Sequence, residues 1–270
     1  MNMKKLFLSA DIEGTCGIAH WDETSLSNAE YGPFADQMSR EVGAACEGLI
    51  LGGAAQVLVR DAHGTARNIR PTLLPQVPEI SLFRGWGRDP YGMMSGIDAT
   101  FDGALFTGYH SACGWDGNPL SHTTNTRNFT IRLNGEIMPE LMSNSLTAAM
   151  FGVPVLMVTG DRMLCDWFHE KVPAAVAVPV SCGVGSGSVS IMPGEALRRI
   201  REGAQQAMTL EPASCMFPVP AHFCVEICYR DPQNARGNSW YPGARQTDSR
   251  TVVFESDNWM DVLTFFHFCN

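Results

Sequence analysis

The chain has 270 residues, enough to bury a large core in one domain or in two unequal ones. Its formal net charge of -9 argues against nucleic acid or an anionic membrane as the natural partner. The nine cysteines are scattered and form no CxxC pair, so we expect reduced thiols and a cytoplasmic location. We expect no signal peptide and no transmembrane segment, because the apolar runs are too short.

The first predicted element is a short buried strand at the apolar residues 6–8, followed by Asp11 and Glu13. In extended geometry, residues two apart point the same way, so both carboxylates could face one point in space. Two like charges that close together are unfavourable unless a cation or a proton compensates them. A metal site is therefore one hypothesis, and a surface turn with two solvated acids is the alternative.

A helical pattern of apolar residues follows over residues 34–50 and ends at the glycine pair 52–53. The next apolar run, residues 56–59, is typical of a strand and leads to Asp61 and His63. A strand, a helix and a strand in succession predict a parallel sheet.

The middle of the chain predicts further strands and one helix. Strands are expected at residues 80–83, at 103–106 before His110, at 129–133 before an Asn-Gly hairpin turn, and at 153–158 before Asp161. A helix is expected over residues 139–150, with Pro139 near its start.

The composition changes near residue 170, after which we expect a helix at 193–208, strands at 222–229 and 251–255, and a terminal helix through residue 266. The predicted fold class is α/β. An N-terminal domain, residues 1–170, is expected to hold a mainly parallel sheet with a metal site at the carboxyl ends of its strands. A smaller α+β domain is expected over residues 171–270.

Several predicted strands end in side chains that can bind a metal: Asp11, Glu13, Asp61, His63, His110 and Asp161. In open α/β sheets, ligands bind in the crevice at the carboxyl ends of the strands, where these groups converge if the strands are parallel. Imidazole with carboxylate suits zinc better than iron or manganese. More than four such groups exceed one tetrahedral zinc site, which favours two metals sharing a bridging carboxylate. This reasoning does not separate Glu140 from Glu136.

Six stretches carry a resemblance to a known family along nearly the whole chain: SADIEG at 9–14, VRDAH at 59–63, GALFTGYH at 103–110, LSH at 120–122, PEL at 139–141 and VPVLMVTGD at 153–161. On these motifs the sequence resembles the DppA-type zinc D-aminopeptidases, which are self-compartmentalising peptidases with a two-zinc site.

The resemblance implies two zinc ions held by five residues: Asp11, Glu13, His63, His110 and Glu140. It implies that Asp11 bridges the ions, with Glu13 and His63 on one ion and His110 and Glu140 on the other. His122 matches the proposed catalytic histidine, as a proton shuttle or as a nucleophile. Asp61 and Asp161 are not ligands in the family pattern.

The implied function is hydrolysis of the N-terminal amide bond of short peptides carrying D-amino acids, or of D-amino acid amides, by metal-assisted chemistry. The implied assembly is a ring-like homo-oligomer, a decamer as in the family. A metal-dependent amidase or lactonase is the first alternative, because the glycine-rich residues 183–187 lack the basic residues common in relatives. A metallophosphoesterase and a metal-free binding protein are further alternatives. Elemental analysis distinguishes the metal-free binding protein from the metal-dependent enzymes, because that alternative expects no stoichiometric transition metal.

Overall fold

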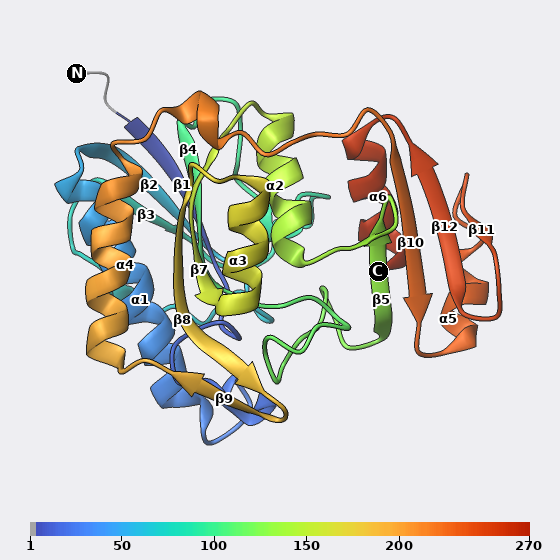
Figure 1. Cartoon of the computed structure of the whole chain (residues 1–270), viewed down its shortest axis with the longest axis horizontal. Helices are drawn as coiled ribbons and strands as arrows, with labels where there is room; N and C mark the ends of the chain where they lie inside the picture. Colours follow the sequence, from blue (N-terminus) through green and yellow to red (C-terminus); the bar gives the residue numbers. More distant parts are fainter. Residues whose placement is uncertain (1–3) are drawn as a thin grey trace.

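The computed structural model describes residues 4–270 and contains two β-sheets (Figure 1). The larger sheet has seven strands in the order β3-β2-β1-β4-β7-β8-β9. Its strands are β1 (Lys4–Ala10), β2 (Ala54–Asp61), β3 (Ile80–Phe83), β4 (Gly103–Tyr109), β7 (Val155–Asp161), β8 (Val176–Val184) and β9 (Gly187–Ser190). All neighbouring pairs are parallel except β8 and β9, which form an antiparallel hairpin.

The central strands β4 and β7 are buried along their whole length, and β1 is buried from Leu6 onward. Near-continuous apolar runs of this kind are typical of parallel strands that are covered on both faces. Helices α1 (Tyr31–Leu51) and α4 (Pro193–Ala207) pack side by side on one face, and α2 (Glu140–Met150) and α3 (Arg162–Lys171) cover the other (Figure 1). The close α1–α4 approach depends on Gly48, where a Cβ atom would meet the carbonyl oxygen of Arg201.

The order of the strands reverses direction between β1 and β4. The chain goes from β1 to β2 and β3 on one side, then returns to β4 and continues to β7 and β8 on the other. A crevice forms at such a switch point, beyond the carboxyl ends of the strands, and is the usual ligand site of open α/β sheets. The fold therefore places the segments after β1, β2 and β4 around one point.

The smaller sheet is antiparallel, with the order β11-β12-β10-β5-β6. Its strands are β5 (Asn128–Leu133), β6 (Glu136–Ile137), β10 (Phe223–Tyr229), β11 (Arg245–Gln246) and β12 (Thr251–Ser256). The predicted Asn-Gly turn connects β5 and β6, and both turn residues have positive φ angles, 50° and 83°. Helix α5 (Pro232–Asn238) precedes β11, and α6 (Trp259–Cys269) packs on this sheet and contacts α2.

The α/β class with a mostly parallel sheet and a second antiparallel sheet is confirmed. The sequence analysis did not predict α3, β8 or β9. The proposed domain division at residue 170 stays a prediction, and the sheets do not follow it: β8 and β9 extend the first sheet, while β5 and β6 belong to the second. No helix within residues 4–270 has the length and apolar character needed to cross a membrane.

Candidate metal centre

The six site residues predicted from the sequence lie together at the switch point. Asp11 directly follows β1, and Glu13 lies in the turn after it. His63 and His110 follow β2 and β4, and Glu140 is the first residue of α2. His122 lies in the long connection between β4 and β5.

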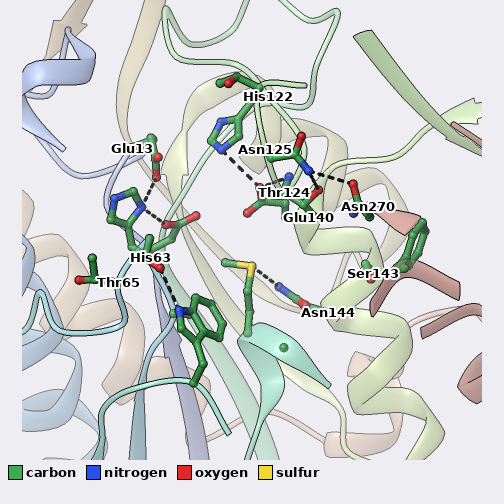
Figure 2. Close-up of a pocket in the computed structure, with 18 of the residues that line it drawn as sticks. Glu13, His63, Thr65, His122, Thr124, Asn125, Glu140, Ser143, Asn144 and Asn270 are labelled. Atoms are coloured by element: carbon green, nitrogen blue, oxygen red, sulfur yellow. Dashed lines mark hydrogen bonds and ion pairs between the residues drawn. The ribbon is translucent and has the colours of Figure 1, made fainter. Parts of the chain in front are cut away.

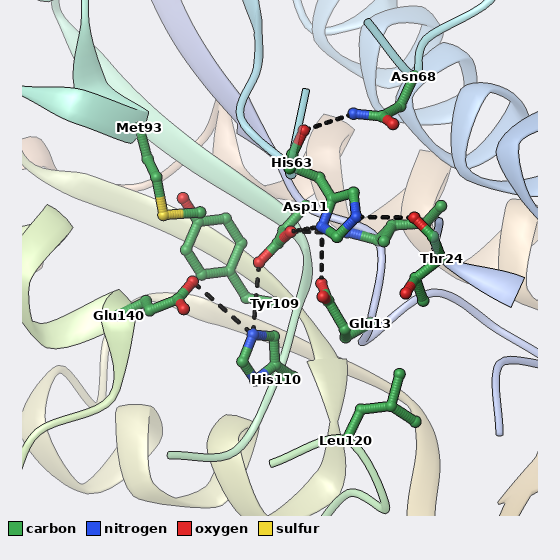
Figure 3. Close-up of polar contacts among 12 residues, drawn as sticks. Asp11, Glu13, Thr24, His63, Asn68, Met93, Tyr109, His110, Leu120 and Glu140 are labelled. Atoms are coloured by element: carbon green, nitrogen blue, oxygen red, sulfur yellow. Dashed lines mark hydrogen bonds and ion pairs between the residues drawn. The ribbon is translucent and has the colours of Figure 1, made fainter. Parts of the chain in front are cut away.

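Two groups of potential metal ligands share the Asp11 carboxylate (Figure 3). In the first, the His63 Nδ1 atom lies 3.1 Å from Asp11 Oδ1 and 3.1 Å from Glu13 Oε2. In the second, the His110 Nε2 atom lies 3.5 Å from Asp11 Oδ2 and 3.7 Å from Glu140 Oε2. Within each group the candidate ligand atoms lie within 4.8 Å of one another. One carboxylate with one oxygen in each group has the geometry that a bridging ligand needs.

The carboxylates of Asp11 and Glu13 come together because the backbone after β1 forms a turn, and not because it is extended. The Thr15 amide donates to the carbonyl oxygen of Ile12 at 2.9 Å, and the Ile12 amide donates to Asp11 Oδ1 at 2.9 Å. The Ile12 side chain is fully buried and anchors this turn. Both carboxylates face the His63 ring, as expected. The backbone that carries them is a turn, however, and not the extended strand from which this was predicted.

Two main-chain carbonyl groups fix which nitrogen of each histidine faces the carboxylates. The His63 Nε2 atom lies 2.9 Å from the Thr24 carbonyl oxygen, and the His110 Nδ1 atom lies 2.9 Å from the Ser111 carbonyl oxygen. Each of these nitrogens donates a hydrogen bond to the carbonyl oxygen, so the opposite nitrogen faces the cluster and would bind a metal ion once it has lost its own proton. Metal-binding histidines are commonly oriented by such a hydrogen bond from their second nitrogen.

An unsatisfied polar atom shows that the cluster fits a cation. The His110 Nε2 atom is buried and has no hydrogen-bond partner within residues 4–270. Its carboxylate neighbours are too distant for a hydrogen bond, but a metal ion between them can accept the lone pair. The ligand set of imidazole nitrogens and carboxylate oxygens also fits zinc.

The pKa values of the metal-free cluster indicate the same need for positive charge. Burial and the charge of Glu13 raise the pKa of Asp11 to about 8. Burial also raises the pKa of Glu13, but the charge and the hydrogen bond of His63, together with the charges of His110 and His122, outweigh burial and hold that pKa well below its ordinary value. Burial lowers the pKa of His110, yet Glu140 and Glu13 together raise it to about 9. The carboxylates thus attract protons where a metal ion would supply the compensating charge.

His122 lies at the edge of this cluster, with its Nε2 atom 3.7 Å from Glu140 Oε1. Its ring stacks on His110 at 4.3 Å between centroids, and Trp21 packs against it edge-on at 5.2 Å. The Nδ1 atom lies 2.9 Å from the Leu120 carbonyl oxygen, so Nδ1 carries the proton and Nε2 is free as a base. Burial and the charge of His110 lower the pKa of His122, which keeps the ring neutral near pH 7.

The position of Glu140 differs clearly from that of Glu136. Glu140 is buried, and its Oε1 atom accepts a hydrogen bond of 2.6 Å from the Thr124 amide, which leaves Oε2 to face His110. Glu136 lies in β6 and pairs with Lys171 and the Trp167 indole, each at 2.8 Å. Glu140 thus lies in a candidate ligand group and Glu136 does not, and the ligand role of Glu140 stays a prediction.

Asp61 and Asp161 point away from the cluster and hold neighbouring loops. The Asp61 carboxylate accepts hydrogen bonds from the Asn68 side chain and from the Ile69 amide, each at 2.8 Å. Asp161 accepts the Ser111 hydroxyl at 2.7 Å and the Leu164 amide at 2.9 Å. Asp161 therefore caps α3 and fixes the segment that follows His110.

The cluster opens into a cavity of about 850 Å³ (Figure 2). Helix α6, which packs on the smaller sheet, contributes Leu263, Phe266 and His267 to the cavity wall. The loops after β1 and β2 of the larger sheet contribute further wall residues. Sequence reasoning missed the other wall residues, including Trp21, Trp86, Ser143 and Arg127, because no local pattern points to them. The glycine-rich residues 183–187 form the β8–β9 turn and do not line this cavity.

Comparisons with known proteins agree on one family. The sequence matches the family Peptidase M55, described as D-aminopeptidase, over residues 3–268. It is similar to the D-aminopeptidase of Bacillus subtilis (strain 168), with 29% identity over 265 residues, which covers 95% of this chain and 93% of that protein. The fold is similar to the Zn-dependent D-aminopeptidase DppA from Bacillus subtilis, a self-compartmentalizing protease. That match has a TM-score of 0.87 and 26% identity, and it covers 97% of this chain and 95% of the other.

Proposed function

Because the chain belongs to the peptidase M55 family of D-aminopeptidases, we propose that its switch-point cluster binds two zinc ions and hydrolyses the first peptide bond of short peptides with an N-terminal D-residue. The chain is a metal-dependent peptide hydrolase of this family. The observation that carries the two-metal proposal is the sharing of Asp11 between two ligand groups.

Each ion has its own set of ligands in this proposal. Asp11 would bridge the two ions. Glu13 and His63 would complete the site of one ion, and His110 and Glu140 would complete the site of the other. Three carboxylates against two divalent ions leave a small net positive charge, which suits a bound water or substrate oxygen. Zinc in the structural relative supports this choice of metal, since that protein is described as Zn-dependent.

Bound zinc would polarise the substrate carbonyl and make water a stronger nucleophile at neutral pH. The chain itself supplies the proton transfers. His122 has a free Nε2 lone pair beside Glu140, so it can accept a proton from the attacking water and return it to the leaving amine. Trp21 and His110 hold the ring between them and thereby limit its rotation.

The family favours a short peptide substrate over the amidase or lactonase alternative, and the cavity size argues against a folded protein substrate. A volume of about 850 Å³ lies in the range of small-molecule sites and is too small for a folded protein.

We further propose a homo-oligomer, with a decamer as the expected size, because the structural relative is described as self-compartmentalizing. All nine cysteines lie within the described residues and are free thiols, which supports the proposed cytoplasmic location.

The test is a panel of D- and L-aminoacyl dipeptides and amides, with and without a chelator, on the wild type, Glu140→Gln and Glu136→Gln. We expect chelator-sensitive hydrolysis of the D-series by the wild type and by Glu136→Gln, and loss of both activity and zinc in Glu140→Gln. Full activity of Glu140→Gln would refute the ligand assignment. Hydrolysis of none of the panel by the zinc-loaded wild type would refute the aminopeptidase function.

A further inference from the structure

The charges that line the cavity are distributed unequally. Three carboxylates, Asp11, Glu13 and Glu140, lie at the metal end. Among the lining residues of the described chain, Arg127 is the single lysine or arginine. It lies in the connection that runs from His122 at the cluster to the start of β5, and its side chain is exposed. Among the lining residues of the described chain, the one permanent positive charge thus comes from a different segment than the three carboxylates do.

Hydrogen bonds within residues 122–128 and to the end of α6 hold Arg127 in this position. Its amide donates to Asn125 Oδ1 at 2.8 Å, and its Nη2 atom donates to the main-chain oxygen of Asn270 at 3.3 Å. The Asn125 side chain in turn donates to Asn270 Oδ1 at 3.1 Å (Figure 2). The backbone that presents the guanidinium group is thus tied to another wall of the cavity.

No Asp or Glu side chain of residues 4–270 forms an ion pair with Arg127. Of the other fifteen arginines, all within the described residues, ten likewise form no ion pair, and five pair with carboxylates: Arg70, Arg198, Arg199, Arg201 and Arg245. Arg127 uses one of its five N–H donors on Asn270, which leaves donors for a ligand. A guanidinium group with free donors recognises a carboxylate through two parallel hydrogen bonds.

The length of the connecting chain sets the reach of this contact. The Thr124 amide is fixed at 2.6 Å from Glu140 Oε1, and Arg127 lies three residues further along. Three residues span at most about 11 Å of backbone. In a peptide held with its scissile carbonyl at the metal ligands, each residue after that carbonyl adds roughly 3.5 Å. The tether therefore sets an upper limit on the distance of Arg127 from the cluster, and a short peptide can span that distance.

We propose that Arg127 binds the free C-terminal carboxylate of the substrate and so makes the enzyme selective for short peptides with a free C-terminus over amides and longer chains. This inference rests on the proposed aminopeptidase function. Arg127 does not touch the reacting atoms, so it determines specificity and is not a catalytic residue. The competing explanation is that Arg127 only anchors the end of α6 through Asn270.

The experiment compares D-alanyl-glycine with D-alanyl-glycine amide on the zinc-loaded enzyme. Loss of the carboxylate should raise KM about two- to fivefold with little change in kcat, because an exposed ion pair contributes up to about 1 kcal/mol and contributes equally to ground and transition states. Arg127→Gln should raise KM for the free acid to the value of the amide, and Arg127→Lys should restore part of the difference. Arg132→Gln in β5, which does not line the cavity, is the matched control.

Equal KM values for the free acid and the amide in the wild type would overturn the inference while leaving the aminopeptidase function intact, and this arm requires no variant. An Arg127→Gln enzyme that keeps its zinc and its preference for the free acid would also overturn it, in favour of the anchoring role. Hydrolysis of neither peptide by the wild type would overturn both this inference and the proposed function.

Discussion

The main-chain amide of Gly14 donates a hydrogen bond of 2.8 Å to the carbonyl oxygen of Gly108. This contact joins the turn after β1 to the end of β4, the two segments that carry Asp11, Glu13 and His110. Neither position has room for a side chain, since a Cβ atom on Gly14 would meet the Tyr109 carbonyl and one on Gly108 would meet the Asp11 carbonyl. Two glycines thus set the distance between the halves of the metal centre.

Gly108→Ala should lower the free energy of unfolding by more than about 3 kcal/mol, or prevent folding. The added Cβ atom would overlap main-chain atoms that cannot move aside, and the residue has a φ angle of +69°, which alanine disfavours. Chemical denaturation measures the change. Gly194→Ala in α4 is the control, because nothing lies within 4 Å of its new Cβ atom. A Gly108→Ala protein as stable as the control would contradict this account of the close approach.

Asp11→Asn and Glu13→Gln should differ in how much zinc they lose. If Asp11 bridges the ions, its amide variant weakens both sites, whereas Glu13→Gln weakens mainly one and should retain about one equivalent of zinc. Elemental analysis of protein after gel filtration reads the stoichiometry directly. Asp22→Asn, on an exposed helical turn, serves as the control. The bridging role of Asp11 would be wrong if both site variants kept the same amount of zinc.

His122→Gln should lower kcat by about 10²–10⁴-fold while the zinc content stays unchanged. The reason is that His122 lies beside the ligand groups and offers a free nitrogen for proton transfer. Steady-state kinetics measures kcat, and elemental analysis measures the zinc content. The wild-type enzyme separates the two chemical roles, because a nucleophilic His122 predicts an acyl-enzyme in rapid-quench mass spectrometry and a proton shuttle predicts none.

Glu41 is a fully buried carboxyl outside the metal centre. It accepts hydrogen bonds from the Cys16 amide at 3.0 Å and from the Gln37 side chain at 2.9 Å, while its Oε2 atom has no partner within the described residues. Burial raises its pKa from 4.5 to about 7, despite these hydrogen bonds. Between these two pH values the folded protein binds more protons than the unfolded chain does.

The free energy of unfolding should therefore fall as the pH rises from about 4.5 to 7, by about 3 kcal/mol from this carboxyl alone. Glu41→Gln should remove that fall and make the protein more stable than the wild type above pH 7. Urea denaturation of the zinc-loaded proteins at several pH values tests this. Glu30→Gln, exposed at the start of the same helix, is the control. An unchanged pH dependence in Glu41→Gln would show that Glu41 is ionised in the fold.

Local patterns in the sequence were enough to predict the fold class and most helices and strands. Continuous apolar runs and helical periodicity are local properties, so β1, β2, β4, β7 and α1 could be predicted from them. The strand-end positions of Asp11, His63 and His110 followed from the same patterns and from the rule that parallel strands end at one edge. Glu140 and His122 came from the family resemblance, because neither stands at the end of a strand.

The way in which distant segments combine became visible in the three-dimensional fold alone. The adjacency of β1 and β4, the entry of β5 into the second sheet and the position of α6 on the cavity wall all depend on contacts between residues far apart in the chain. Such contacts are fixed by strand register, by the Gly14–Gly108 approach and by packing, which no local pattern records. For the same reason Arg127, one exposed arginine among many in the sequence, gains a role only where the fold places it on the cavity.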